Sequence, residues 1–183
     1  VCETNGKKVP KGDDLIAETL RFIDATGHPK KNVGIEKRSW FLTAAVAEAL
    51  AGGMANSRIV DSSYLVERVR LIKSEAEVAC LRRAGEISEI EHRAALQAMH
   101  DGVLEKDVAA AVFNAGIAAG CEYAGLPHHI MSGYRYDVCH ANWIPKPIVK
   151  GELTLLELYG CVERYHSTQM RTVSMGPPQD DVR

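Results

Sequence analysis

The stretch Leu71-Ile72-Lys73-Ser74-Glu75-Ala76-Glu77 separates two parts of the chain with different predicted secondary structure. Ser74 and Glu77 form a capping-box pattern, in which each side chain accepts a hydrogen bond from the other residue's backbone amide. This pattern predicts the start of a helix. Apolar residues at helical spacing extend that helix to about His100, and Asp101-Gly102 ends it.

The sequence after this helix predicts a second helix and then strands. The second helix is expected over residues 105–119, stopping at Gly120. From residue 128 onward, β-branched and aromatic residues alternate with turn signals such as Ser132-Gly133 and Lys150-Gly151. Residues 71–183 therefore predict an α+β arrangement, in which two helices precede a mostly antiparallel sheet.

The sequence before the stretch alternates between helix and strand patterns. The expected elements are a helix over 13–26 stopped by Gly27, a strand over 32–36, a helix over 40–51 capped by Ser39, a strand over 58–61 and a short helix within 62–73. This order is typical of an α/β domain but is too short for a complete sheet. We therefore expect residues 1–70 to be the end of a small α/β N-terminal domain and its linker.

Composition narrows the function class. The 183 residues are 46% apolar and 25% charged, as in globular proteins, and the net charge of −2 offers no basic excess for nucleic acid. No apolar run is long enough to span a membrane. Five cysteines without a C-x-x-C pair, and no secretory signal, favour free thiols in the cytoplasm.

Two residues are candidates for chemistry. Glu157 lies among apolar residues in a predicted strand, and a buried carboxylate is costly unless it is paired. Arg171 on the next strand is a candidate partner, which leaves open either a buried structural pair or a site. His140 is a candidate acid–base residue, because imidazole titrates near neutral pH. Cys139 would face the opposite side of a strand, so a thiol–imidazole pair is rejected.

Taken together, these segments resemble the creatinase, aminopeptidase P and prolidase family. The stretch 71–77 is similar to its R-x-I-K-S-x-x-E motif. The other matching motifs follow in the family's order: Asp101-Gly102-Val103, Glu105-Lys106-Asp107-Val108, Ser132-Gly133, His140, Gly151, Tyr165 and Arg171-Thr172-Val173. The resemblance implies that residues 71–183 form the first half of a pita-bread catalytic domain. We expect the chain to be a fragment that ends after this half.

The resemblance also assigns roles to residues. Metal-dependent members carry an Asp at the position of Glu157 and a second Asp at that of Thr168, and a threonine is a poor ligand for a divalent ion. No metal is therefore expected at this pair. The ectoine hydrolase and creatinase branch is the most similar, with His140 as the implied acid–base residue. Glu157 would bind a cationic substrate nitrogen, and Arg171 would hold a carboxylate or order its strand.

The resulting hypothesis is a segment of a C–N hydrolase that acts on a small zwitterionic amidine or guanidino compound. Met170 stands where creatinase has a Glu, which argues against creatine itself. One alternative is a segment of a metal-dependent Xaa-Pro dipeptidase or aminopeptidase using Mn, Co or Zn. Another is a non-catalytic pita-bread binding module. We expect a homodimer with a small-molecule substrate and no nucleic-acid or membrane partner, and no activity from the isolated chain.

Overall fold

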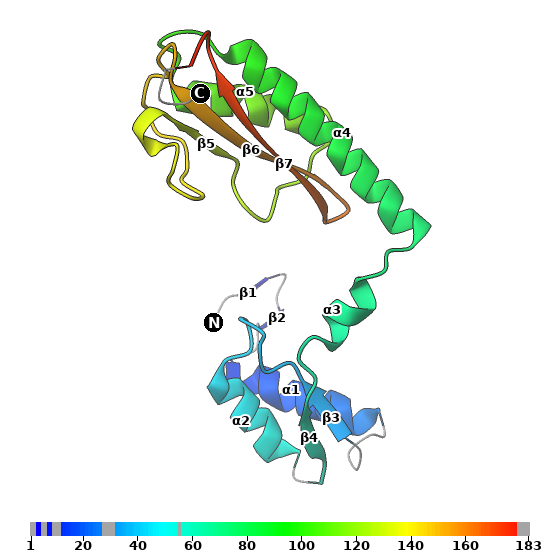
Figure 1. Ribbon diagram of the computed structural model, residues 1–183. Coiled ribbons are helices and arrows are strands. Elements are labelled where there is room, and N and C mark those ends of the chain that lie inside the picture. The colour runs from blue at the N-terminus through cyan, green and yellow to red at the C-terminus, as the bar shows by residue number, and fades with distance from the viewer. Residues whose placement is uncertain (1–2, 5–6, 9–11, 27–31, 55, 179–183) are drawn as a thin grey trace. The chain divides into compact units, whose positions relative to one another are not determined.

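The computed structural model describes residues 3–4, 7–8, 12–26, 32–54 and 56–178 (Figure 1). It divides the chain into two compact units, Val1–Ile72 and Lys73–Arg183, which are described separately. Gly27, the expected stop of the first helix, lies outside the described residues.

The first unit is an α/β segment. Its elements are β1 (Glu3–Thr4), β2 (Lys7–Lys8), α1 (Gly12–Ala25), β3 (Asn32–Ile35), α2 (Ala44–Gly53), β4 (Arg58–Asp61) and α3 (Leu65–Arg70). Strands β3 and β4 pair in parallel, with Val33 opposite Ile59, and α2 provides the connection between them. The predicted order of helices and strands over residues 13–73 is confirmed, whereas β1 and β2 were not predicted.

The predicted start of α2 is wrong. The helix begins at Ala44, and its N-cap is Thr43, whose hydroxyl accepts a hydrogen bond from Val46 N at 3.3 Å. Ser39 instead accepts from Phe41 N within the preceding turn. Both residues are good caps, so local sequence could not decide between them.

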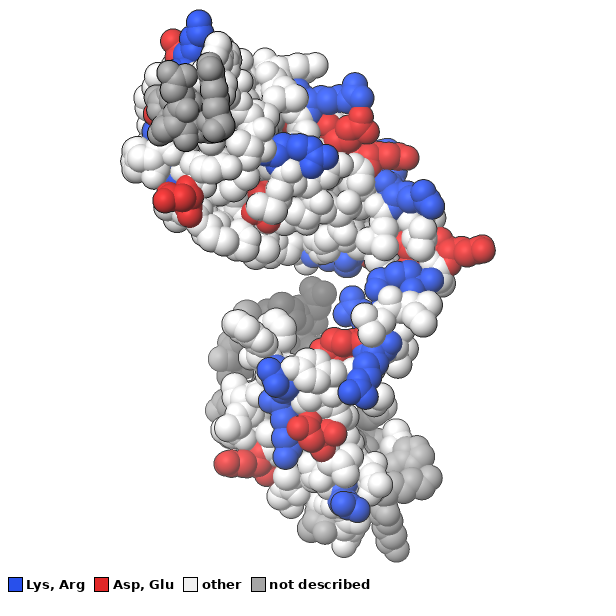
Figure 2. Space-filling view, viewed as in Figure 1, with Lys and Arg blue, Asp and Glu red and all other residues white. Residues whose placement is uncertain are grey.

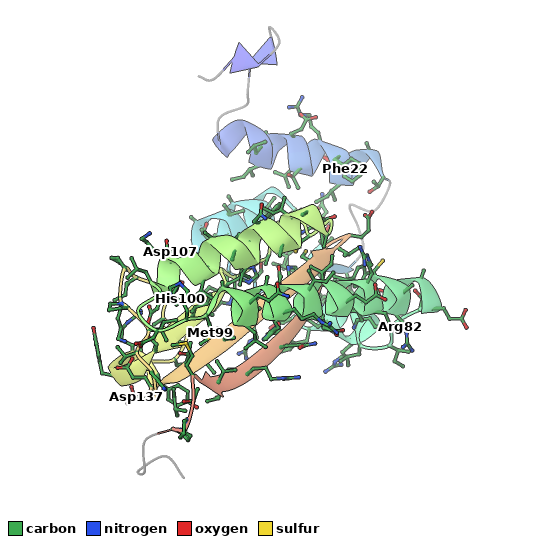
Figure 3. The ribbon with its side chains drawn as sticks, turned by 90° about the horizontal axis from the view of Figure 1, so that it is seen from above. Phe22, Arg82, Met99, His100, Asp107 and Asp137 are labelled. Atoms are coloured by element: carbon green, nitrogen blue, oxygen red, sulfur yellow. The ribbon has the colours of Figure 1, made fainter. Side chains whose placement is uncertain are left out.

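The second unit begins with the predicted capping box. Ser74 N donates to Glu77 Oε2 at 2.7 Å, and Glu77 N donates to Ser74 Oγ at 3.4 Å. Helix α4 (Glu75–Ala98) then runs for 24 residues. Helix α5 (Glu105–Ala118) follows and packs beside α4, as the view from above shows (Figure 3).

The sheet of the second unit is antiparallel, in the order β5-β6-β7. Its strands are β5 (His129–Ser132), β6 (Leu153–Val162) and β7 (Tyr165–Ser174). Helices α4 and α5 cover one face, where Leu156 and Leu158 join Val108, Val112 and other residues in the buried core. The α+β arrangement predicted for this part of the chain is confirmed.

Helix α4 approaches the sheet unusually closely at Gly160. A Cβ atom on this residue would lie 1.9 Å from the carbonyl oxygen of Ala84. Gly160 N donates to Ser88 Oγ at 3.0 Å, and that hydroxyl donates to Ser167 O at 2.8 Å. One serine of the helix is therefore bonded to two strands.

The outer side of α4 is solvated and carries both signs of charge. Figure 2 shows acidic and basic side chains alternating along it, where Arg83 pairs with Glu86 and Arg93 pairs with Glu89. Within the described ranges, no helix has the length and apolar character needed to cross a membrane.

Candidate active site

The face of the sheet opposite the helices carries the candidate site. Side chains alternate along a strand, so Glu157 and Tyr159 point away from the core that holds Leu156 and Leu158. The ladder places His129 of β5 directly opposite Glu157. Directly opposed residues share a face, so His129 belongs to the same surface.

A loop over residues 133–152 brings His140 to this face. Glu105, fully buried at the start of α5, organises that loop by accepting hydrogen bonds from Ser132 N at 2.9 Å and Ile144 N at 3.1 Å, and by pairing with Arg135. His140 itself has a φ of 55°. A left-handed backbone is uncommon for residues other than glycine, although histidine adopts it more readily than most.

The structure brings the predicted acid–base residue and the predicted carboxylate together. His140 Nε2 lies 3.5 Å from Glu157 Oε2. The Tyr159 hydroxyl donates to the other carboxylate oxygen, Oε1, at 2.6 Å. The His140 side chain is 56% exposed, whereas that of Glu157 is 7% exposed, so solvent reaches the imidazole more easily than the carboxylate.

His129 completes the cluster. Its ring stacks on that of His140 with centroids 5.1 Å apart and contacts the Tyr159 ring edge-on at 6.0 Å. Burial lowers the pKa of His129, the Glu157 carboxylate opposes this effect, and His140 adds to the lowering. Burial therefore favours the neutral form of the His129 imidazole, and its ring is a packing surface for His140.

Tyr159 is set to act as a hydrogen-bond donor. Burial raises the pKa of its phenol far above the usual value, and the hydrogen bond and charge of Glu157 raise it further. The protonated phenol holds one carboxylate oxygen of Glu157 in place. The other oxygen has no hydrogen-bond partner among the described residues.

Arg171 does not join Glu157. The register pairs Arg171 with Leu156, on the helix-facing side of the sheet, whereas Met170 pairs with Glu157. The exposed guanidinium donates to the carbonyl oxygen of Met170 at 2.7 Å. The buried Glu157–Arg171 pair suggested by the sequence is therefore wrong, because the two residues lie in opposite phases of the strand pattern.

The surroundings of Cys139 and His140 also differ from the sequence interpretation. They lie in the loop and not on a strand, and Cys139 is exposed. Cys80, Cys121, Cys139 and Cys161 are free thiols, whereas Cys2 lies outside the described residues.

Sequence reasoning assigned no functional role to several buried polar residues around the site. They are His129 and Tyr159 on the sheet, and Glu91 and His128 on its helix side. Glu91 follows Ile87 by four residues and precedes Ala95 by four, and all three are buried. That spacing on the buried face of α4 was the signal that could have identified Glu91.

Comparison with known proteins agrees with this architecture. Residues 79–183 match Metallopeptidase family M24, and residues 3–72 match the Creatinase/Prolidase N-terminal domain. The chain belongs to metallopeptidase family M24. It is 35% identical over 157 residues to an uncharacterized hydrolase/peptidase of Sinorhizobium fredii, a match that covers 84% of this chain and 40% of that protein.

Two further M24 relatives extend the comparison. The ectoine hydrolase of Halomonas elongata is 27% identical over 180 residues, covering 93% of this chain and 45% of the enzyme. The prolidase structure from Pyrococcus horikoshii has a TM-score of 0.78 and 27% identity, covering 96% of this chain and 47% of that one. The chain thus spans less than half the length of these relatives.

M24 enzymes typically depend on divalent metal ions. Glu157 and Thr168 occupy the two positions that the resemblance assigns to metal ligands. One Glu157 oxygen accepts from Tyr159, and Thr168 offers only a neutral hydroxyl. In the part of the chain that the structure describes, no group of three His, Cys, Asp or Glu side chains could hold a metal ion. These residues do not fit a divalent ion.

Proposed function

We propose that this chain forms part of a C–N hydrolase that acts on a small zwitterionic amidine or guanidino compound. The observation that supports this most directly is the position of His140 Nε2, 3.5 Å from Glu157 Oε2. One oxygen of this carboxylate accepts a hydrogen bond from Tyr159, and the other is available to bind a cationic nitrogen. An imidazole beside that nitrogen suits proton transfer to and from it.

The proposed reaction uses the chain's own groups. A water molecule gives a proton to His140 Nε2 as its oxygen attacks the amidine or guanidino carbon. The protonated imidazole then donates that proton to the departing nitrogen as the C–N bond breaks, so no net proton is lost or gained. Glu157 binds the substrate cation, and Tyr159 keeps the carboxylate oriented. No step passes through a metal ion, because the donor set of Glu157 and Thr168 does not suit one.

The proposal gives Arg171 no direct contact with the substrate. Its side chain lies on the sheet face opposite Glu157, which favours the role of ordering β7 over that of holding a substrate carboxylate. We also infer that the complete protein is a cytoplasmic homodimer. Because its relatives are more than twice as long, we expect these 183 residues alone to turn over no substrate.

The alternative is a metal-dependent Xaa-Pro peptidase, which the likeness to prolidase favours and Thr168 disfavours. A non-catalytic binding module is the remaining candidate. The deciding experiment measures hydrolysis of ectoine, creatine and an Ala-Pro dipeptide by the complete protein, with and without a chelator. We expect the protein to hydrolyse ectoine, the cyclic amidine among these substrates, whether or not the chelator is present. Hydrolysis of Ala-Pro that the chelator abolishes would establish the peptidase, and binding without turnover would establish the module.

A further inference from the structure

A second polar group lies beneath the site, on the helix side of the sheet, and the proposed reaction does not use it. Glu91 of α4 and His128, which directly precedes β5, are 1% and 3% exposed. Glu91 Oε1 lies 3.4 Å from His128 Nε2, and Glu91 Oε2 has no hydrogen-bond partner among the described residues. A buried carboxylate with so little compensation lowers stability relative to an apolar residue of similar size.

The hydrogen bond on the other side of the ring fixes the tautomer of His128. Tyr159 N donates to His128 Nδ1 at 3.2 Å, so this nitrogen carries no hydrogen. The hydrogen of the neutral imidazole is then on Nε2, which faces Glu91. The Tyr159 amide thus selects the tautomer, and the carboxylate, which faces the hydrogen on Nε2, helps to orient the ring.

Two aromatic rings and a helix glycine pack closely around the pair. The His128 ring lies 4.5 Å from that of Phe113 and stacks on Tyr159 at 6.0 Å with an interplanar angle of 14°. A Cβ atom at Gly116 of α5 would come within 2.2 Å of Glu91 Oε1. The absence of a side chain at Gly116 leaves room for the carboxylate in this position.

Tyr159 connects this pair to the site. Pairing with β5 begins where His129 faces Glu157, so Tyr159 lies beyond the end of β5 and its amide is bonded to the His128 ring instead. Its phenol donates to Glu157 at 2.6 Å. His128 therefore holds the backbone of the residue whose side chain holds the carboxylate.

We propose that Glu91 and His128 are positioning residues for Glu157. They fix the backbone and ring of Tyr159, and Tyr159 orients the carboxylate toward the cationic nitrogen of the substrate. This inference rests on the proposed function. It assigns the pair to substrate binding and not to proton transfer, so its loss raises KM and leaves kcat nearly unchanged.

Two isosteric variants of His128 separate the two nitrogens. His128→Asn places its carbonyl oxygen near the position of Nδ1 and keeps an acceptor for Tyr159 N. His128→Gln places its polar atoms near Nε2 and loses that acceptor. With ectoine as substrate for the complete protein, we expect His128→Gln to raise KM about tenfold or more, since small displacements of binding groups are costly. His128→Asn should raise KM by less, because it keeps the acceptor for Tyr159 N and loses only the contact with Glu91.

A readout without substrate accompanies the kinetics. Hydrogen exchange of the Tyr159 amide should be fast in His128→Gln and slow in His128→Asn. If the wild-type protein does not hydrolyse the amidine, the proposed function fails, and the amide exchange decides the positioning role alone. Equal protection of the Tyr159 amide in the two variants would overturn that role.

The control is His92→Gln. His92 is a buried histidine of α4, and its Nδ1 is bonded to Ser88 O at 2.9 Å. Loss of this hydrogen bond should lower the stability of the protein and leave KM unchanged. If His128→Gln does not fold, Glu91→Leu removes the contact of the carboxylate with His128 Nε2 and should raise KM to about the same extent as His128→Asn. The same KM in His128→Asn and His128→Gln, or a matching rise in His92→Gln, would reduce the pair to a structural role and overturn the proposal.

Discussion

Tyr159 and Glu157 lie two residues apart on the same strand, and the phenol donates a 2.6 Å hydrogen bond to the carboxylate. Residues at this spacing point to the same face, so the bond runs along the strand without crossing it. It leaves Glu157 Oε2 as the single oxygen that faces His140. The site therefore offers one acceptor for a cation, next to the imidazole of His140.

Replacing His140 should remove proton transfer. We expect His140→Ala in the complete protein to lower kcat by about 10²-fold or more, with a smaller effect on KM, because this is the usual contribution of general acid–base catalysis. Steady-state kinetics on the amidine substrate test this. The control is His100→Ala, at an exposed histidine just after α4 (Figure 3), which should leave both constants unchanged. Near-wild-type turnover by His140→Ala would remove it from the mechanism.

Replacing Glu157 should weaken substrate binding. Glu157→Gln keeps the shape of the side chain but removes its charge, so KM should rise by about tenfold or more, the equivalent of one charge-assisted contact. Tyr159→Phe leaves the charge and removes only the hydrogen bond, so a smaller rise is expected. An unchanged KM in Glu157→Gln would show that the substrate cation binds elsewhere.

The donor set predicts how the site responds to metal. The wild-type chain should retain no stoichiometric divalent ion after purification, because Thr168 supplies a hydroxyl where a carboxylate is needed. Thr168→Asp combined with Glu157→Asp should increase the affinity for Mn²⁺ in isothermal titration. About one tightly held Mn or Zn per wild-type chain, measured by elemental analysis, would contradict this prediction.

The buried imidazole of His129 predicts a dependence of stability on pH. Its pKa in the folded protein lies below the ordinary value of about 6.5, so at pH values between the two the unfolded chain binds more protons. The His129 contribution to the free energy of unfolding should thus be complete above about pH 6.5 and decrease as pH falls toward the folded pKa. Urea unfolding at several pH values tests this. His129→Gln should flatten the acid side of the profile; an identical acid slope in the variant would exclude His129 as its origin.

Local patterns predicted most of the fold. The capping box at Ser74 and Glu77 forms within four consecutive residues, so its physics is entirely local. The order of helices and strands follows from periodicity for the same reason. The start of α2 was wrong because Thr43 and Ser39 are equally good caps, and only the fold selects one.

The site was less predictable, because its geometry depends on distant contacts. His140 lies beside Glu157 because Glu105 of α5 holds the loop that carries His140. No local sequence pattern carries that information. Arg171 was paired incorrectly because the phase of β7 relative to β6 is set by register. Glu91 escaped attention because a charged residue on a helix is ordinarily taken as solvent-facing.

The close approach between α4 and the sheet at Gly160 limits which substitutions the folded protein can tolerate at this position. Every missense change at this codon adds at least a methyl group, which would have to occupy a position 1.9 Å from the Ala84 carbonyl oxygen. A backbone atom of a packed helix cannot move aside as a flexible side chain can. In a deep mutational scan of the complete protein, position 160 should therefore tolerate glycine alone, whereas Gly52, which has open space around it, should accept many residues.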